Sequence, residues 1–306
     1  MDPPGSCARL GDVIVVVGEA LIDLVISPGG DVETSLGGAP FNTARACGRL
    51  GAAVSFVGAL SSDRFGRMLD AQLAADGVRT ADASVVDEPT TLAAAELDDH
   101  GAASYRFYIA GTSAPALPDP PRVVGDVLFS GGLGLVLEPM AESVTSMVAA
   151  FDGAVMIDVN CRPRIVPDRE RYLDRVGRVL STTDIVKVSD DDLAYLEPDA
   201  EPLDAARSLL DRGPKVVLLT AGARGAHVLT VSGERFVPAT VVDVVDTVGA
   251  GDSFGAGFLV AWTEGGAVES FDDLDRLTDA SAFAARVAAV VCSRRGADPP
   301  WRSEVG

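Results

Sequence analysis

Two features of the sequence predict an α/β protein with a doubly wound, mostly parallel sheet and a small β-sheet lid. From about residue 120 onward, short apolar runs alternate with amphipathic helical patterns. Continuous apolar strands of this kind indicate a parallel sheet that is covered by helices on both faces. The N-terminal third instead contains an alternating strand and a hairpin signal, which predict a second, smaller sheet.

The elements of the main sheet follow in a regular order. The first apolar run, residues 13–17, is expected to be a buried strand, and helical patterns cover residues 39–50 and 64–75. Later strands are expected at residues 127–130, 154–159, 185–188 and 215–220, and helices at residues 139–150, 169–180 and 202–212. Ligands of open α/β sheets bind beyond the carboxyl ends of the strands, so polar residues at those ends are site candidates.

The lid is expected from strands that pair with one another outside the parallel core. Residues 21–26 alternate in polarity, and a turn at residues 29–31 leads to residues 33–35. Two β-rich runs, 91–97 and 104–109, are joined by residues 98–101, which is a hairpin signal. These patterns predict a lid of residues 19–36 and 89–111 and a core of residues 1–18, 37–88 and 112–306.

Composition excludes several classes of function. The chain of 306 residues carries a formal net charge of −20, so it repels nucleic acid and anionic membranes, and a phosphate site must supply positive potential locally. No apolar run approaches the roughly 20 residues that cross a bilayer, and no basic region precedes the first strand, which indicates a cytoplasmic protein. Four dispersed cysteines and two histidines argue against a zinc site and a disulfide framework.

Residues 246–259, DTVGAGDSFGAGFL, indicate the type of reaction more specifically than any other segment. A β-branched stretch, 241–245, leads into two glycines, and an apolar helical pattern follows. The amides that open such a helix lack intrahelical partners and attract an anion. The carboxylate of Asp252 would be repelled by a phosphate bound there, so its presence needs a functional reason. Such a reason is that Asp252 removes a proton from a hydroxyl that attacks the phosphate. The alternative is an Asp that caps a helix after a glycine turn.

Polar groups also occur near the ends of other strands on the N-terminal side. Asp23 could accept hydrogen bonds from two sugar hydroxyls at once. Gly37 and Gly38 open a helix whose first turn carries Asn42, where a polyol could dock. The alternative is that these residues have only structural roles, in turns and at the start of a helix.

Three further strand exits lie in the second half of the chain. Asp158, Asn160 and Arg162 alternate, and Arg162 either contacts a phosphate or sugar oxygen or pairs with Asp158. The next exit starts at Lys187 and continues with Ser189, and a helix N-cap at Ser189 explains the acidic first turn that follows. The alternative is that these acidic groups hold water around a metal-bound nucleotide. The third exit, TAGARG at residues 220–225, suits close approach of a nucleotide to the backbone.

Together these motifs resemble the ribokinase-like, PfkB-type carbohydrate kinase family over nearly the whole chain, from Gly18 to about Trp301. Residues 37–42, GGAPFN, resemble the first signature of the family, and residues 246–252, DTVGAGD, resemble the second, which is highly specific. The resemblance implies an ATP-dependent phosphotransferase with an α/β core and a β lid that closes over a sugar.

The resemblance also implies roles for individual residues. Asp252 matches the catalytic base of the family, and the amides of Gly249, Ala250 and Gly251 match its anion hole. The sugar side would include Asp23, Gly37, Gly38, Asn42, Tyr105, Phe107, Asn160 and Arg162. The nucleotide side would include Lys187, Ser189, Thr220, Gly222 and Gly225. A monovalent cation, typically potassium, would bind the carbonyls of Asp246 and Val248.

The sequence departs from the family pattern in two places. The usual Asn-x-x-Glu, which organises magnesium and phosphate, appears as Ser189-x-x-Asp192; Asp192 can still orient a hydrated magnesium ion. Near the C-terminus, Ala284 and Ala285 stand where many members place Asn or His beside adenine.

The sequence leaves two possible sugar substrates. The motifs are closest to those of fructokinases, and 2-keto-3-deoxygluconate kinases share much of them. A neutral ketohexose fits if Tyr105 and Phe107 face the site, and an acid sugar fits if Arg106 does. Other nucleoside or sugar kinases and a non-catalytic, sugar-binding regulatory protein are further alternatives, although the retained Asp252 disfavours the last. The edge strands of the lid offer a place for a homodimer to pair.

Overall fold

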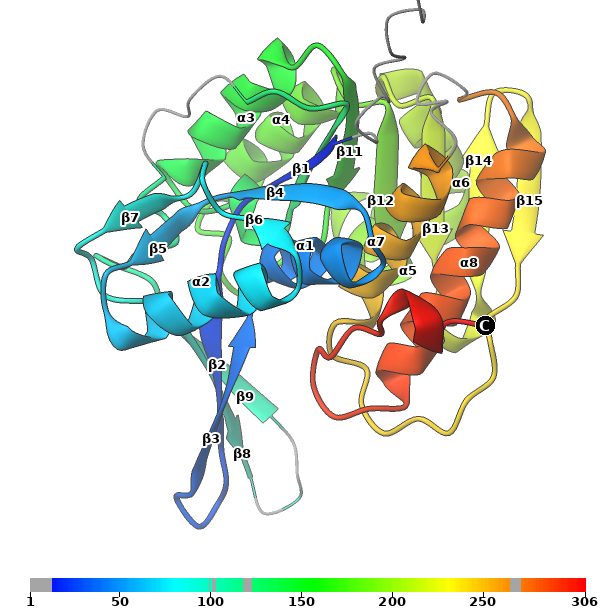
Figure 1. The fold of residues 1–306 in the computed structure, drawn as a ribbon. Helices are drawn as coiled ribbons and strands as arrows, with labels where there is room; N and C mark the ends of the chain where they lie inside the picture. Colours follow the sequence, from blue (N-terminus) through cyan, green and yellow to red (C-terminus); the bar gives the residue numbers. More distant parts are fainter. Residues whose placement is uncertain (1–12, 99, 101–102, 118–122, 265–270) are drawn as a thin grey trace, which may run out of the picture.

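The computed structural model describes residues 13–98, 100, 103–117, 123–264 and 271–306. Its main sheet has nine strands in the order β15-β14-β13-β12-β11-β10-β1-β4-β6 (Figure 1). All neighbours in this sheet pair in parallel except β13 with β14 and β14 with β15. The strands are β1 (Val13–Val17), β4 (Ala53–Val57), β6 (Val78–Arg79), β10 (Val127–Gly131), β11 (Ala154–Asp158), β12 (Ile185–Ser189), β13 (Val216–Thr220), β14 (Ala226–Thr230) and β15 (Gly233–Val237).

Helices cover both faces of this sheet. Along β1, Ile14 and Val16 join the core on one face, and Val15 and Val17 join the core on the other. The first face is covered by α1 (Ala39–Arg49), α2 (Arg64–Ala75), α7 (Ala250–Thr263) and α8 (Leu274–Cys292). The second face is covered by α3 (Met140–Ala150), α4 (Arg169–Leu180), α5 (Asp190–Leu196) and α6 (Pro202–Leu209). This double layer confirms the predicted fold class.

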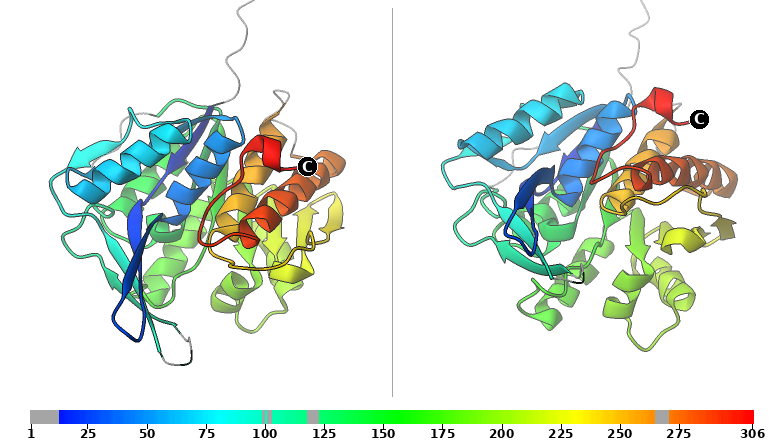
Figure 2. Two further views of the ribbon diagram at one scale, coloured as in Figure 1. Left: turned by 60° about the horizontal axis from the view of Figure 1, so that its bottom comes forward. Right: turned by 90° about the horizontal axis from the view of Figure 1, so that it is seen from below.

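A separate four-stranded sheet, in the order β3-β2-β8-β9, projects from the body of the molecule (Figure 1, Figure 2). Its strands are β2 (Leu21–Ile26), β3 (Val32–Gly37), β8 (Leu92–Leu97) and β9 (Ala103–Tyr108). β8 and β9 form the antiparallel hairpin that the sequence predicts. β2 follows β1 after three residues, and β3 leads directly into α1, so this sheet is anchored at the carboxyl edge of the main sheet.

Most differences from the sequence prediction concern short or exposed elements. The helix expected at 202–212 ends at Leu209 and continues to Arg212 as a 3-10 turn. The β-branched stretch 241–245, for which the sequence predicts no particular element, forms no strand and is largely exposed, with Val241 at 96%. A short pair, β5 (Ala59–Ser61) with β7 (Ser84–Val86), completes the strands. Among the described helices, none has the length and apolar character that crossing a membrane requires.

Candidate active site

The turn before α7 presents backbone amides to solvent. Gly249 has a left-handed backbone (φ 77°, ψ 0°) and precedes Ala250, the first helical residue. Within the described part of the chain, the amides of Gly251 and Asp252 have no acceptor, and Gly251 is exposed. Free amides at the positive end of a helix dipole attract an anion, so this turn is suited to hold a phosphate group.

The C-terminal segment fixes the shape of this turn. A Cβ atom at position 249 would lie 2.6 Å from Cβ of Ala297, which explains why glycine is required. The carboxylate of Asp246 accepts hydrogen bonds from the amides of Gly296 (2.8 Å) and Val248 (3.1 Å). The carbonyl oxygens of Asp246 and Val248 accept no hydrogen bond from any described residue, so both are free to coordinate a cation.

Asp252 lies in the first turn of α7, nearly buried at 9% exposure. Its Oδ2 accepts a hydrogen bond from Nδ2 of Asn42 on α1, at 2.9 Å. Burial raises the pKa of Asp252 to about 6, although the Asn42 hydrogen bond and the charges of Lys187 and Arg162 act to lower it. A carboxylate with a pKa near neutrality is suited to act as a general base.

Lys187 lies beneath the same turn. Its Nζ pairs with Oδ2 of Asp158 at 2.8 Å, with both side chains buried, and a Cβ on Gly251 would be 3.4 Å from this Nζ. Burial alone would lower the pKa of Lys187, but the carboxylates of Asp158 and its neighbours raise it above the usual value. The ammonium group therefore supplies positive potential below the amides of the turn, in a protein of net charge −20.

The segment after β11 turns sharply at Asn160, the one non-glycine residue with a positive φ (43°) among those described. Arg162 Nη1 donates to the carbonyls of Asn160 (3.2 Å) and Cys161 (3.0 Å) and to the Asn160 side chain. The alternative that Arg162 pairs with Asp158 is wrong, because Arg162 donates to residues 160 and 161 and the ion pair of Asp158 is made by Lys187, through Oδ2. Without an ion pair, the charge of Arg162 still acts to lower the pKa values of Asp158 and of the other acids around the site.

Ser189 and Asp192 form a reciprocal capping box at the start of α5, as the N-cap interpretation predicts. Ser189 Oγ accepts from the Asp192 amide at 3.0 Å, and Asp192 Oδ2 accepts from the Ser189 amide at 2.8 Å. Asp192 Oδ1 also accepts from the amide of Cys161 at 2.6 Å. Among the described residues, no group of three or more acidic, His or Cys side chains forms a metal cage. An outer-sphere role at a hydrated, phosphate-bound magnesium ion is compatible with this geometry.

The two glycines that follow β13 have different surroundings. Gly222 has a positive φ (54°) and open space where a Cβ would be, whereas a side chain at Gly225 would overlap the Val237 carbonyl. Thr220 donates weakly to the carbonyl of Val188 at 3.4 Å. Gly222 is therefore open to a ligand, while Gly225 is explained by packing.

Asp23 and the glycines at residues 37 and 38 lie where the small sheet joins the core. A side chain at Gly37 would overlap the Asp23 carboxylate, and a Cβ on Gly38 would be 2.8 Å from the carbonyl of Glu19. Burial raises the pKa of Asp23 to about 6, although the charge of Arg162 lowers it. The Asp23 carboxylate has no hydrogen-bond partner among the described residues and is available to hydroxyl groups.

Strand register decides which lid side chains share the face of Asp23. Asp23 is opposite Ala93, and Ala93 is opposite Phe107, so these three residues point to one face. Tyr105 lies two residues from Phe107 on β9 and shares that face, whereas Arg106 points to the other.

Contacts agree with this assignment of faces. The ring of Tyr105 lies under the guanidinium of Arg164, which follows β11 in the core, with 5.8 Å from Cζ to the ring centroid. Arg106 instead approaches Glu96 of the neighbouring strand at 3.7 Å, and both side chains are exposed. The face with Tyr105, Phe107 and Asp23 is therefore turned toward the core.

Three buried side-chain oxygens around the site lack a partner: Glu19 Oε2, Asn42 Oδ1 and Asp158 Oδ1. All three side chains interact with Asp252. Asn42 donates a hydrogen bond to it, the charge of Asp158 raises the pKa of Asp252, and the charge of Asp252 raises the pKa of Glu19. Buried acceptors normally have a donor, so this cluster is expected where hydroxyl or water donors complete a site.

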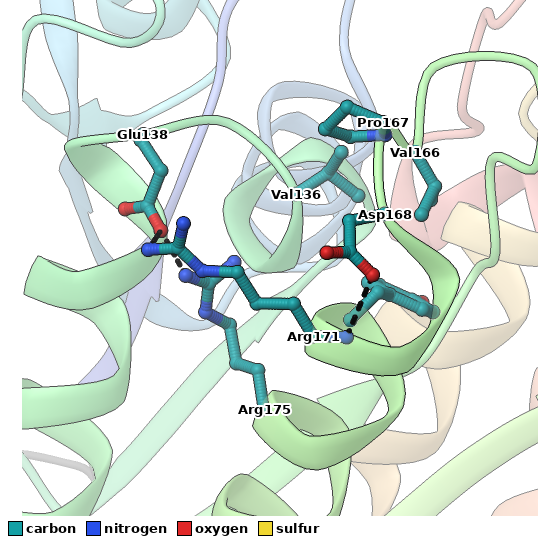
Figure 3. Close-up of a pocket in the computed structure, with 8 residues that line it drawn as sticks. Val136, Glu138, Val166, Pro167, Asp168, Arg171 and Arg175 are labelled. Atoms are coloured by element: carbon teal, nitrogen blue, oxygen red, sulfur yellow. Dashed lines mark hydrogen bonds and ion pairs between the residues drawn. The ribbon is translucent and has the colours of Figure 1, made fainter.

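A different pocket lies between α4 and the segment before α3 (Figure 3). Its volume is about 50 Å³, which compares with roughly 30 Å³ for one water molecule and is too small for a sugar or a nucleotide. Arg171 and Arg175 both contact Glu138 there, and Asp168 caps α4 through the amide of Arg171. The size of this pocket therefore excludes it as the site of phosphotransfer.

Comparison with known proteins agrees with this geometry. Residues 12–304 match the pfkB family carbohydrate kinase profile. The chain belongs to the pfkB family of carbohydrate kinases. It is a phosphotransferase that acts on a sugar hydroxyl.

Individual relatives of this pfkB family member are sugar and nucleoside kinases. The chain is 34% identical over 264 residues to a fructokinase of Rhizobium leguminosarum bv. trifolii, covering 81% of this chain and 79% of that one. Fructokinase from Xylella fastidiosa with bound ATP superposes with a TM-score of 0.87, at 30% identity and 96% coverage of both chains. Aminoimidazole riboside kinase from Salmonella enterica has a TM-score of 0.85, at 25% identity, covering 96% of this chain and 98% of that one.

The structure adds two residues that sequence reasoning did not single out in this pfkB site. Glu19 is a buried acid whose neighbourhood cannot be inferred from a strand pattern, because its contacts come from distant segments. Arg164 follows Arg162 by two residues, and that alternation could have identified it as a partner of the lid.

Proposed function

We propose that this chain is an ATP-dependent fructokinase, which transfers the γ-phosphoryl group of ATP to a hydroxyl of a neutral ketohexose. The main support is the lid register, which turns Tyr105 and Phe107 toward the core and Arg106 away from it. An aromatic face suits an uncharged sugar ring, and Asp23 suits its hydroxyls. The fructokinase relatives support the same substrate class.

The proposed mechanism centres on Asp252. Its ionised carboxylate accepts the proton of the sugar hydroxyl as that oxygen forms a bond to the γ-phosphorus. The bond between that phosphorus and the β–γ bridging oxygen breaks, and ADP leaves. The free amides of Gly249 and Gly251 stabilise the charge on the transferred group, and Lys187 adds positive potential from below. The amide of Ala250 already donates to the carbonyl of Thr247 at 3.2 Å, so it would join this anion hole only by exchanging that acceptor for the phosphoryl group.

The same proposal assigns the remaining site residues. Asn42 orients Asp252, while Gly37, Gly38, Asn160 and Arg162 contribute to the sugar subsite. The nucleotide subsite is formed by Ser189, Thr220 and Gly222, of which Gly222 has open space beside it, while Gly225 shapes this turn by packing against the Val237 carbonyl. Ala284 contributes no polar contact to adenine, because it is buried against Gly257 of α7.

Two cations complete the proposed site. Magnesium bound to the phosphates would be oriented through water by Asp192 and would neutralise phosphate charge. Potassium would be held by the free carbonyls of Asp246 and Val248 and would add positive charge beside the turn. We also propose that the lid, residues 19–36 and 89–111, excludes water from the reaction.

A 2-keto-3-deoxygluconate kinase is the second candidate, because one observation favours it. Arg164 lies over Tyr105, on the face that is turned toward the core, where a guanidinium could pair with a sugar carboxylate.

The test is a comparison of ADP release with fructose, 2-keto-3-deoxygluconate and aminoimidazole riboside in the presence of ATP, magnesium and potassium. We expect the highest kcat/KM with fructose and ATP hydrolysis without sugar far below phosphotransfer. Preference for the acid sugar would instead support the second candidate. Binding of fructose without any turnover would support a non-catalytic, sugar-binding protein.

A homodimer through the lid is a further proposal. β3 and β9 are the edges of the small sheet, and Val32 and Tyr108 on these strands are 54% and 50% exposed. Open edges and exposed apolar side chains favour pairing with a second copy. Light scattering should give twice the mass of the chain, and a monomeric mass would contradict this proposal.

A further inference from the structure

Glu19 is a buried carboxyl group between β1 and the start of α1. Its side chain is 2% exposed, and its Oε1 accepts a hydrogen bond from the amide of Ala39 at 3.2 Å. Its second oxygen, Oε2, is enclosed and has no partner among the described residues. A buried acid that uses one oxygen and leaves the other unpaired requires an explanation beyond packing.

The start of α1 lacks a cap of its own. Gly38, at the N-cap position, has no side chain and a positive φ (109°). Helices commonly satisfy a free first-turn amide with an oxygen from a Ser, Thr, Asp or Asn at that position. Here Glu19, in the connection between β1 and β2, supplies this oxygen to the Ala39 amide. α1 also carries Asn42, which donates to Asp252, so the contact at Glu19 acts on the site through this helix.

The surroundings of Glu19 favour its neutral form. Burial raises the pKa of Glu19 to about 8, while the charge of Arg162 lowers it and that of Asp252 raises it. Arg162, after β11, and Asp252, on α7, are the charged groups that act on it; the start of α1 contributes the amide of Ala39. The turn at Gly132 contributes backbone, with a Cβ there only 3.2 Å from Oε1.

A neutral Glu19 has a clear advantage for the proposed chemistry. An ionised Glu19 would place a second negative charge near Asp252, which would raise the pKa of that base and repel the phosphates of ATP. A carboxylic acid still accepts the Ala39 hydrogen bond through Oε1, and it presents an O–H donor at Oε2.

We propose that Glu19 is a positioning residue that acts in its protonated form, holding the start of α1 so that Asn42 reaches Asp252. This inference rests on the proposed sugar kinase activity of the same site. It assigns to Glu19 an effect on sugar phosphorylation through α1, without contact with the reacting atoms.

The test compares Glu19→Gln and Glu19→Ala with the wild-type chain in fructose phosphorylation from pH 6 to 9.5. We expect the wild type to lose activity above pH 8, as Glu19 ionises. Gln keeps the acceptor and cannot ionise, so E19Q should keep kcat/KM within about threefold of the wild type at pH 7 and should not show this decline. Ala removes the acceptor, so E19A should lower kcat/KM roughly 5- to 30-fold, the range for loss of a cap.

A matched control separates positioning from general destabilisation. Asp168 caps α4 through the amide of Arg171 at 3.1 Å, away from the site. Asp168→Ala should lower stability without changing the pH profile. An E19A enzyme that is as active as the wild type, or an E19Q enzyme with the wild-type alkaline decline, would overturn the inference.

A second readout does not depend on turnover. Since the pKa of folded Glu19 is raised from 4.5 to about 8, its stabilising effect is present at low pH and is lost as the pH rises through about 8. The thermal midpoint of E19Q should therefore exceed that of the wild type by an amount that grows between pH 5 and pH 9. A constant difference would refute the buried neutral acid, even if no tested sugar were a substrate.

Discussion

Acidification should switch off phosphotransfer by protonating Asp252. With a pKa of about 6, this carboxyl group is roughly 90% ionised at pH 7 and roughly 10% ionised at pH 5. Because only the ionised form accepts a proton, kcat/KM should fall about tenfold over this range. An ordinary Asp, with a pKa of 3.8, would still be more than about 90% ionised at pH 5, so activity would change little.

The variant Asn42→Ala makes this prediction specific to the site. The Asn42 hydrogen bond lowers the pKa of Asp252, so its removal should move the acidic midpoint to higher pH. Initial rates of ADP release from pH 5 to 8 provide the measurement. The terminal phosphate of ATP titrates identically for both enzymes, so a difference between their midpoints belongs to the protein.

Two results would refute this reasoning. One is a wild-type profile that stays flat down to pH 5 while the protein remains folded by circular dichroism. The other is an Asn42→Ala midpoint equal to that of the wild type, which would mean that the titrating group is not the acid that Asn42 contacts.

Three further predictions concern other parts of the structure. Asp76→Asn should lower the free energy of unfolding by about 3–5 kcal/mol in urea denaturation, because Asp76 is buried between two arginines of α1; an unchanged value would contradict this. Gly249→Ala should lower the free energy of unfolding by at least about 1–2 kcal/mol and sharply reduce kcat, because of its positive φ and the nearby Ala297; full activity would show that the turn tolerates a side chain. Phe107→Ala should raise KM for fructose about tenfold, whereas Arg106→Ala should change it less than about twofold; the reverse order would mean that the lid faces are assigned wrongly.

The sequence predicts the layers of this fold well, because continuous apolar strands and amphipathic helices carry strong periodic signals. β1 and α4 have the expected bounds, and the lid hairpin is confirmed. The helix expected at residues 202–212 shows the limit of such reasoning. Its α-helical part ends at Leu209 and a 3-10 turn follows to Arg212, and an apolar helical pattern alone does not locate that change.

The site is predicted from sequence where a motif is local, and less well where contacts come from distant segments. The turn at Gly249 and the proposed base Asp252 share one short motif, and the Ser189 cap follows from spacing alone. The pairing of Lys187 with Asp158 joins neighbouring strands, and the position of Glu19 depends on α1 and the turn after β10. Neither can be read from a single segment.

The most direct test of the proposed chemistry is Asp252→Asn. Turnover of fructose should fall about 10²-fold or more, the usual effect of removing a positioned base, while the affinities for fructose and ATP in calorimetry stay within a few-fold of the wild type. Phosphorylation of fructose by Asp252→Asn at the wild-type rate would contradict the assignment of this carboxylate as the base.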